Sequence, residues 1–252
     1  MSMEIKYLDC ILVPLGILTM AVYHIWLLRR IIKYPTDTVI GVNAISRRFW
    51  VHSMMEDVGK NGVLAVQTLR NNIMASTVLA STAIMLSSLI ALLMTSGARS
   101  ENSAAWFDIG NRSRREFSIK YFLILLCFMA VFLLNIQSIR YYSHASILIN
   151  IPFKKVYSDQ RHHGLTAEYV AATVNKGSYF WSLGLRGFYF SLPLFFWIFG
   201  PIHMVVSCLV LVFMLYFLDV NVESGSAVGD SDDNGTDGSE DDAEDGSLDY
   251  SI

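Results

Sequence analysis

The 22 residues IMASTVLASTAIMLSSLIALLM, at positions 73–94, contain no charged side chain. Three other stretches, at 10–28, 121–136 and 192–218, are likewise uncharged. A helix that crosses the hydrocarbon core of a bilayer needs about 20 predominantly apolar residues. The sequence therefore predicts an all-α fold, a polytopic transmembrane helical bundle.

Composition supports this prediction and divides the chain in two. Hydrophobic residues make up 53% of the 252 residues and the mean hydropathy is +0.42, above the usual range of soluble domains. All 19 Lys and Arg lie at or before Arg186, whereas residues 221–252 are strongly acidic and contain no basic residue. We predict an integral membrane domain over 1–220 and a disordered acidic C-terminal tail over 221–252.

The number of spans depends on residues 177–218, which contain one charge, Arg186. A single helix over these residues would be about 60 Å long, twice the hydrocarbon thickness. Gly200-Pro201 lies near the middle, and we predict two helices, about 167–199 and 202–219. With helices at about 8–32, 62–93 and 118–150 this makes five spans. The alternative is four spans, with one kinked helix over 188–218.

The distribution of basic residues predicts the orientation. Loops 29–72 and 137–187 carry thirteen Lys and Arg, whereas 1–9 and 95–120 carry six. Basic loops stay in the cytosol, so we expect the N-terminus outside or in the lumen and the acidic tail in the cytosol. Helices two to four should extend into the cytosol. Plasma membrane and endomembrane are equally compatible with this multi-pass arrangement.

Two helical patterns predict packing. Ser76, Ala80, Ala83, Ser87 and Ala91 lie on one helix face, and small residues allow close backbone approach between membrane helices. This face predicts that the second spanning helix is the central, most buried one; a hydrophilic path along its Ser and Thr is the alternative.

Within the loop 34–60, Trp50, Val51, Met54 and Val58 recur at helical spacing. This amphipathic loop helix lies either on the membrane surface or against the cytosolic face of the bundle.

Three arginines fall within predicted spanning helices near their cytosolic ends. Arginine inside a membrane is costly and normally faces the bundle interior, a water cavity or an anionic partner. One interpretation is that each side chain reaches the lipid headgroups. The other is a convergent cationic site that binds a small anion or an anionic lipid headgroup through guanidinium and amide groups. The candidate ligand-binding residues are Gln67, Arg70, Asn71, Asn135, Gln137, Arg140 and Arg186.

Other chemistry has no sequence signal. The chain contains no phosphate-binding loop, dinucleotide fingerprint or nucleophile elbow. Its three Cys and six His are dispersed, and its basic residues border membrane spans instead of forming a nucleic-acid-binding stripe. We therefore expect no cofactor, no metal site, no nucleic-acid partner and no enzymatic activity.

Three stretches together resemble a known family: RNNIMASTVLAST at 70–82, NIQSIRYYSHASILINIP at 135–152 and GLRGFYFSLPLFFWIFGP at 184–201. They are similar to the plant branch of the membrane family called domain of unknown function 599, over residues 5–220. In bacterial members the last helix typically ends in basic residues, which implies a cytosolic C-terminus and five helices. In this chain Asp219 and Glu223 stand there instead. The family brings no established reaction or ligand.

The bilayer is the first expected partner, and two functions are compatible with the sequence. The first is handling or sensing an anionic solute or lipid through the arginine cluster. Transport by five helices would need a channel-like or homo-oligomeric assembly, because no inverted repeat is evident. The alternative is a membrane scaffold or accessory subunit that recruits partners through its acidic tail and amphipathic loop.

Overall fold

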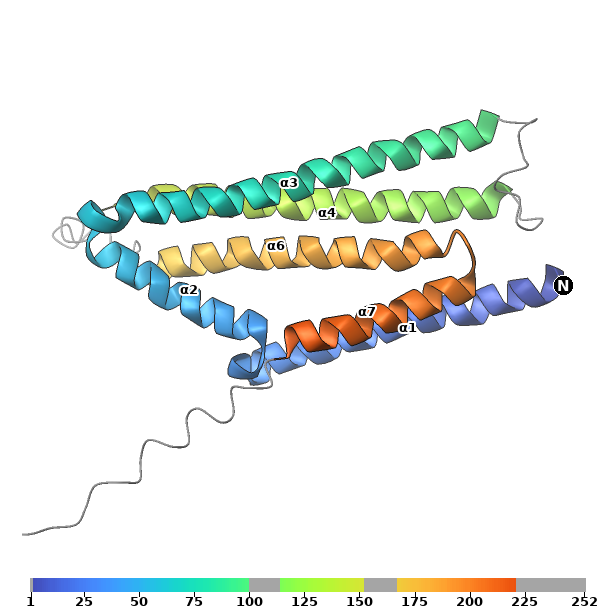
Figure 1. Ribbon diagram of the computed structural model, residues 1–252, viewed down its shortest axis with the longest axis horizontal. Helices are drawn as coiled ribbons and strands as arrows, with labels where there is room; N and C mark the ends of the chain where they lie inside the picture. The colour runs from blue at the N-terminus through green and yellow to red at the C-terminus, as the bar shows by residue number, and fades with distance from the viewer. Residues whose placement is uncertain (1, 100–113, 152–166, 221–252) are drawn as a thin grey trace, which may run out of the picture.

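The computed structural model describes residues 2–99, 114–151 and 167–220, and within them it is helical (Figure 1). Described residues form no strand, which confirms the all-α fold. The elements are α1 (Ser2–Lys33), the 3-10 turn η1 (Pro35–Asp37), α2 (Val39–Glu56), α3 (Val58–Arg99), α4 (Arg114–Leu148), α6 (Ala167–Phe196) and α7 (Pro201–Asp219). The predicted tail over 221–252 lies outside the described residues.

Four helices are long and apolar enough to cross a membrane, over Asp9–Lys33, Val58–Ser96, Phe117–Leu148 and Pro201–Asp219. Helix α6 is a fifth long helix beside them, and the chain reverses between α6 and α7. Gly200 makes the reversal with φ of 153°, where a side chain would be strained, and Pro201 begins α7. One kinked helix over 188–218 is therefore wrong, because the two halves are antiparallel.

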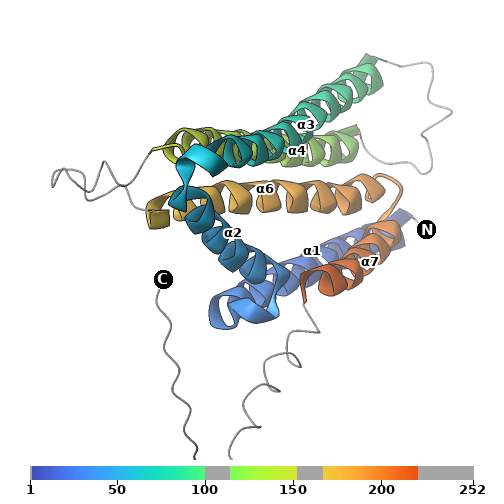
Figure 2. The same ribbon diagram turned by 60° about the vertical axis from the view of Figure 1, so that its left-hand side comes forward.

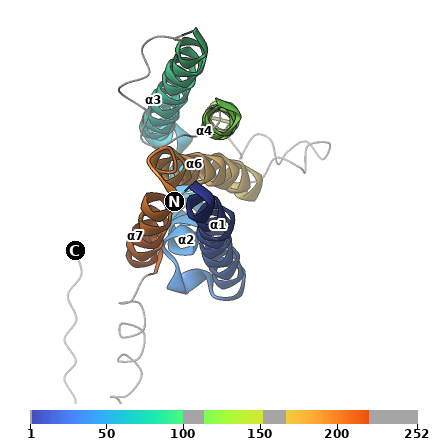
Figure 3. The same cartoon turned by 90° about the vertical axis from the view of Figure 1, so that its right-hand side faces the viewer.

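Helix α6 occupies the centre of the bundle. It lies between the α3–α4 pair and the α1–α7 pair, as the end-on view shows (Figure 3). The prediction that the second spanning helix is central is wrong, because α3 lies at the edge and packs mainly against α4. Its small-residue face is nevertheless used: Ser76, Ala80, Ala83 and Ser87 are buried, whereas Ala91 is exposed.

Glycines on α6 allow α4 to approach closely. A Cβ at Gly184 would lie 2.5 Å from Asn135 Nδ2, and a Cβ at Gly177 would lie 3.1 Å from the Tyr142 ring. Ser138 on α4 donates to the Gly177 carbonyl oxygen at 2.8 Å, and its hydroxyl lies 3.1 Å from that of Ser76 on α3. These contacts tie α3, α4 and α6 together by the close packing that stabilises helices in lipid.

Helix α2 crosses from the α1–α7 pair to the α3–α4 pair at one end of the bundle (Figure 2). We call this the α2 end and the opposite end, at Gly200-Pro201, the Gly-Pro end. Helix α2 packs against α6 with Val51 and Met55 buried. Of the two alternatives for this amphipathic segment, packing on the bundle is therefore the observed one.

Three helices extend beyond α1 and α7 at the α2 end (Figure 1). With 42 and 35 residues, α3 and α4 are about 63 and 52 Å long, whereas α7, with 19, is about 28 Å. The extension, formed by parts of α3, α4 and α6 braced by α2, has its own core of buried side chains, including Val51, Leu69 and Tyr142. The predicted projection of helices two to four is thus present; that it lies in the cytosol stays a prediction.

Candidate lipid-facing site around Arg186

A buried ion pair joins α6 to the last turn of α7. Arg186 Nη2 donates to Asp219 Oδ1 at 2.5 Å, and the two side chains are 13% and 8% exposed. The Tyr23 hydroxyl on α1 donates to the other carboxylate oxygen at 2.7 Å. The charge of Arg186 is therefore neutralised within the protein, and the same carboxylate links α1, α6 and α7.

Asp219 is not among the site residues predicted from sequence. Arg186 lies 14 residues before Gly200, and Asp219 lies 18 residues after Pro201 on the returning helix. On two antiparallel helices these distances from the turn differ by four residues, about 6 Å, which a long arginine side chain can bridge. The sequence signal that could have identified this pair is two opposite charges at similar distances from the Gly-Pro turn, on the two helices that the turn connects.

Arg186 also lines an apolar groove. It has a volume of about 590 Å³ and runs between α1 and α4, with α6 as its floor. Its walls are apolar apart from Arg186, His24 and Cys127. The groove is within the size range of small-molecule sites, about 300–1,000 Å³. We call it the lateral groove because it lies among the apolar parts of spanning helices. Its residues are Ile17, Met20, Ala21, His24, Leu123, Leu126, Cys127, Ala130, Val131, Leu134, Arg186, Gly187, Phe190 and Leu194.

Three residues at the groove carry polar side-chain groups, and they differ in whether those groups have hydrogen-bond partners. Arg186 Nη1 is buried and has no hydrogen-bond partner in the described part of the chain. His24 Nδ1 lies 2.7 Å from the Met20 carbonyl oxygen, and Cys127 donates to the Gly187 carbonyl oxygen at 3.4 Å. A buried guanidinium N–H without an acceptor is costly, and Nη1 is the Arg186 nitrogen that is buried and without an acceptor among the described residues.

The structure does not bring the three predicted arginines together. Gly177, at the level of Ser138, lies nine residues before Arg186 on α6, about 13 Å nearer the α2 end. Arg140 lies about 3 Å further in that direction along α4, and Arg70 about 9 Å beyond the level of Ser76 along α3. Along the bundle axis, Arg186 is thus about 16 Å from Arg140 and about 22 Å from Arg70.

The surroundings of the remaining candidates differ as well. Arg70 is exposed and donates to Gln67, also exposed, at 2.7 Å. Arg140 is exposed, with its guanidinium 6.0 Å from the centre of the Tyr141 ring. Asn71 is exposed, Gln137 is half-buried, and Asn135 is buried against Gly184. Ligand binding by these residues stays a prediction.

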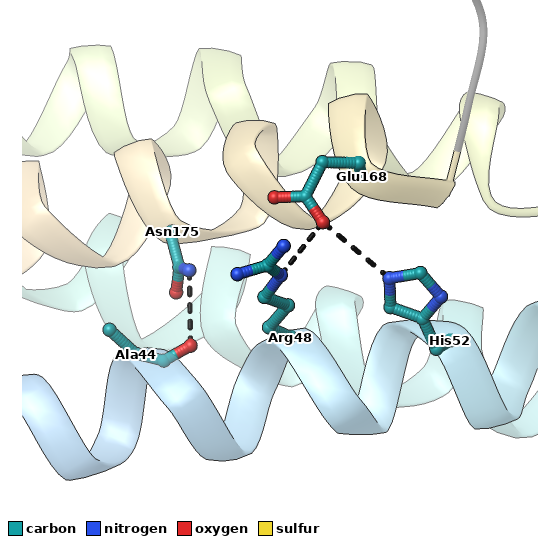
Figure 4. Close-up of polar contacts among 5 residues, drawn as sticks. All are labelled: Ala44, Arg48, His52, Glu168 and Asn175. Carbon is teal, nitrogen blue, oxygen red and sulfur yellow. Dashed lines mark hydrogen bonds and ion pairs between the residues drawn. The ribbon is translucent and has the colours of Figure 1, made fainter.

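A second polar cluster joins α2 to α6 in the extension (Figure 4). Asn175 donates to the Ala44 carbonyl oxygen at 3.1 Å and accepts from Arg47 at 2.8 Å. Glu168 accepts from Arg48 at 2.7 Å and lies 3.6 Å from His52. Burial lowers the pKa of Arg47. Since these groups satisfy one another, we assign the cluster to holding α2 in place.

No group of three or more His, Cys, Asp and Glu within the described ranges is arranged to hold a metal ion. No curated protein and no solved structure matches this chain. The family described as "Protein of unknown function, DUF599" matches residues 11–224, which include all of the groove and the Arg186–Asp219 pair. The chain therefore belongs to the DUF599 family.

Proposed function

We propose that this protein is a non-enzymatic membrane protein that binds a lipid or fatty-acid amphiphile in the lateral groove. The acyl chain lies between α1 and α4, and an oxygen of the polar head accepts from Arg186 Nη1. The observation that carries the proposal is that a buried, unpartnered guanidinium nitrogen belongs to a residue at an otherwise apolar groove. The acyl chain of an amphiphile matches the apolar groove, and an oxygen of its head matches the unpartnered nitrogen.

A lipid fits this groove better than a soluble anion does. Asp219 already neutralises Arg186, so a free anion would gain little net attraction and would lose its hydration among apolar walls. An amphiphile instead enters from the bilayer and buries its chain. From the sequence we expect either an anionic solute or a lipid headgroup as the ligand, and the proposal keeps the lipid. Of the three arginines in the expected cluster, the proposal keeps Arg186.

The proposed setting follows from sequence. The basic residues at the α2 end favour a cytosolic extension, with the N-terminus outside or lumenal. Arg186 then lies at the same level as the end of α7, near the cytosolic leaflet, so the amphiphile comes from that leaflet. The three family-like stretches favour the plant branch, with plasma membrane or endomembrane as location.

Photo-crosslinking tests the proposal directly. The purified protein is reconstituted with a phospholipid that carries a diazirine on one acyl chain, and crosslinked peptides are mapped by mass spectrometry. Labelling should concentrate on groove residues of α1, α4 and α6. Ala130→Leu fills the groove and should reduce that labelling severalfold, whereas Ala75→Leu, on an exposed face of α3, should leave it unchanged. Uniform labelling of all lipid-exposed faces, unaltered by Ala130→Leu, would contradict the proposal.

A scaffold role is the second candidate, and one observation favours it. Val220, the last described residue, pairs with Thr38 immediately before α2, and the acidic residues 221–252 follow it in the sequence. Phe49 on α2 is 71% exposed. Deleting 221–252 separates the candidates: lost partner capture with unchanged groove labelling supports a scaffold.

A further inference from the structure

We infer that a basic pocket at the corner between α1 and η1 binds the phosphate group of an anionic lipid. The pocket has a volume of about 690 Å³ and is lined by the last two turns of α1 together with Tyr34 and Asp37. The α1 residues in it are Trp26, Arg29, Arg30, Ile32 and Lys33. We call it the corner pocket.

The corner pocket carries an excess positive charge. Arg30 is held in place, with its guanidinium 5.4 Å from the centre of the Trp26 ring and 3.7 Å from Asp37. Arg29 and Lys33 have no ion-pair partner among the described residues. Three cations against one carboxylate leave a formal charge of +2. Phosphate is the anion that Arg and Lys bind well together, because Arg offers paired N–H donors and Lys a point charge.

The wall of the corner pocket is fixed by the backbone. Thr38 is fully buried, caps α2 by accepting from the Gly41 N–H, and pairs with Val220 at the end of α7. Gly41 touches the preceding turn so closely that a Cβ there would lie 2.0 Å from the Pro35 carbonyl oxygen. The turn that carries Asp37 is thus held before any ligand arrives, which lowers the entropic cost of binding.

The position of the pocket selects a lipid phosphate over a soluble one. Helix α1 ends in Arg30 and Lys33 beside the end of α7, so its apolar stretch finishes here, at the depth of lipid headgroups. Trp26 is a typical residue of that interface. Exposed Leu28 and Ile32 next to the pocket offer a surface for acyl chains.

The corner pocket and the lateral groove are separate sites. On α1 the groove residues are 17, 20, 21 and 24, and the pocket residues include 26, 29, 30 and 33. The two sets have the same spacing but are offset by nine residues, which is a half-turn at about 100° per residue. They face opposite sides of the helix, so either site can exist without the other.

The test is a binding titration of the full chain in detergent. The probe is dioctanoyl phosphatidic acid, and dioctanoyl phosphatidylcholine and inorganic phosphate are compared. Arg29→Gln with Lys33→Gln removes two pocket charges and should weaken phosphatidic acid binding about 30-fold, given the usual contribution of a basic residue near a lipid surface. The matched control is Lys60→Gln with Lys176→Gln, which removes two exposed charges towards the same end and should change affinity less than about threefold.

Each outcome decides the inference. Tight binding of phosphatidic acid over phosphatidylcholine, lost only in the pocket variant, supports it. Equal weakening by both double variants would show a general charge effect and overturn it. Inorganic phosphate binding as tightly as phosphatidic acid would replace the lipid by a free phosphate. Ala130→Leu, which fills the lateral groove, should lower the binding of both dioctanoyl lipids alike and keep the preference for phosphatidic acid, whereas the pocket variant should remove that preference, so the two proposals can fail separately.

Discussion

Removing the Asp219 carboxylate should destabilise the bundle more than any other single charge deletion in the described chain. Asp219→Ala leaves Arg186 buried, with 13% of its side chain exposed, and without its counter-charge. It also deprives the Tyr23 hydroxyl of its acceptor. Breaking a buried pair by removing one partner costs about 3–5 kcal/mol, because the remaining charge is desolvated and uncompensated. For a domain of this size that corresponds to a fall in Tm of about 10 °C.

The control is an exposed ion pair that, like the Arg186–Asp219 pair, joins α6 to another helix. Glu168→Ala removes the partner of Arg48, and these side chains are 52% and 59% exposed. Solvent already screens that pair, so a Tm change of no more than about 2 °C is expected. Both variants are measured by heating in detergent and following the folded peak by size-exclusion chromatography. Each variant is expressed as a fusion to a fluorescent protein, so the folded peak can be normalised to the amount of protein expressed.

A third variant separates the ion pair from general damage. Changing Arg186→Met and Asp219→Leu together removes both charges and keeps the space filled, which for buried pairs is often neutral. The double variant should therefore be more stable than Asp219→Ala alone. If Asp219→Ala lowers the Tm no more than Glu168→Ala does, or if the two changes at the pair simply add, the pair is not buried as described and the reasoning is refuted.

Three further substitutions test packing by the same heating assay. Gly184→Ala should cost about 1–3 kcal/mol, because its Cβ would lie 2.5 Å from buried Asn135; Gly59→Ala, with nothing nearer than 3.5 Å, is its control. Ser138→Ala should cost only about 0.6 kcal/mol, since hydrogen bonds between membrane helices are weak on average; a loss several times larger would contradict this. Gly41→Ala should displace the α1–η1 corner and weaken phosphatidic acid binding, and unchanged affinity would show that the corner pocket does not depend on that backbone.

The helices were predictable because the physics behind them is local. Uncharged runs of bilayer length determine α1, α3, α4 and α7, and Gly200-Pro201 determines the reversal before α7. The small-residue face on α3 correctly predicts a close contact. It does not say how many helices surround α3, so the inference that α3 is central fails.

The site was less predictable because it depends on which helices become neighbours. Arg186 stands out in the sequence as a buried cation, but its partner lies 33 residues away on α7. The lateral groove has no sequence motif, because it is a space left between α1 and α4 above α6. The sequence predicts Arg70, Arg140 and Arg186 alike near the cytosolic ends of spanning helices, yet α3 and α4 extend well beyond α7, so a similar sequence context corresponds to different depths.

The central position of α6 explains how a long helix with three charged side chains can pack within the bundle. Helix α6 carries Glu168, Lys176 and Arg186 and is not among the four helices apolar enough to span alone. Its neighbours supply what lipid cannot: Asp219 on α7 provides an acceptor for Arg186, Tyr23 on α1 donates to the same carboxylate, and α4 covers the glycines of α6. Lipid provides no polar partner, so each polar group of α6 must find one within the protein. Arg186 Nη1 and Trp181 Nε1 are the two buried α6 atoms for which the described chain provides none, and of these two residues Arg186 lines the groove. The proposed function supplies a partner for Arg186 Nη1 at the groove, in the form of an oxygen of the amphiphile's head.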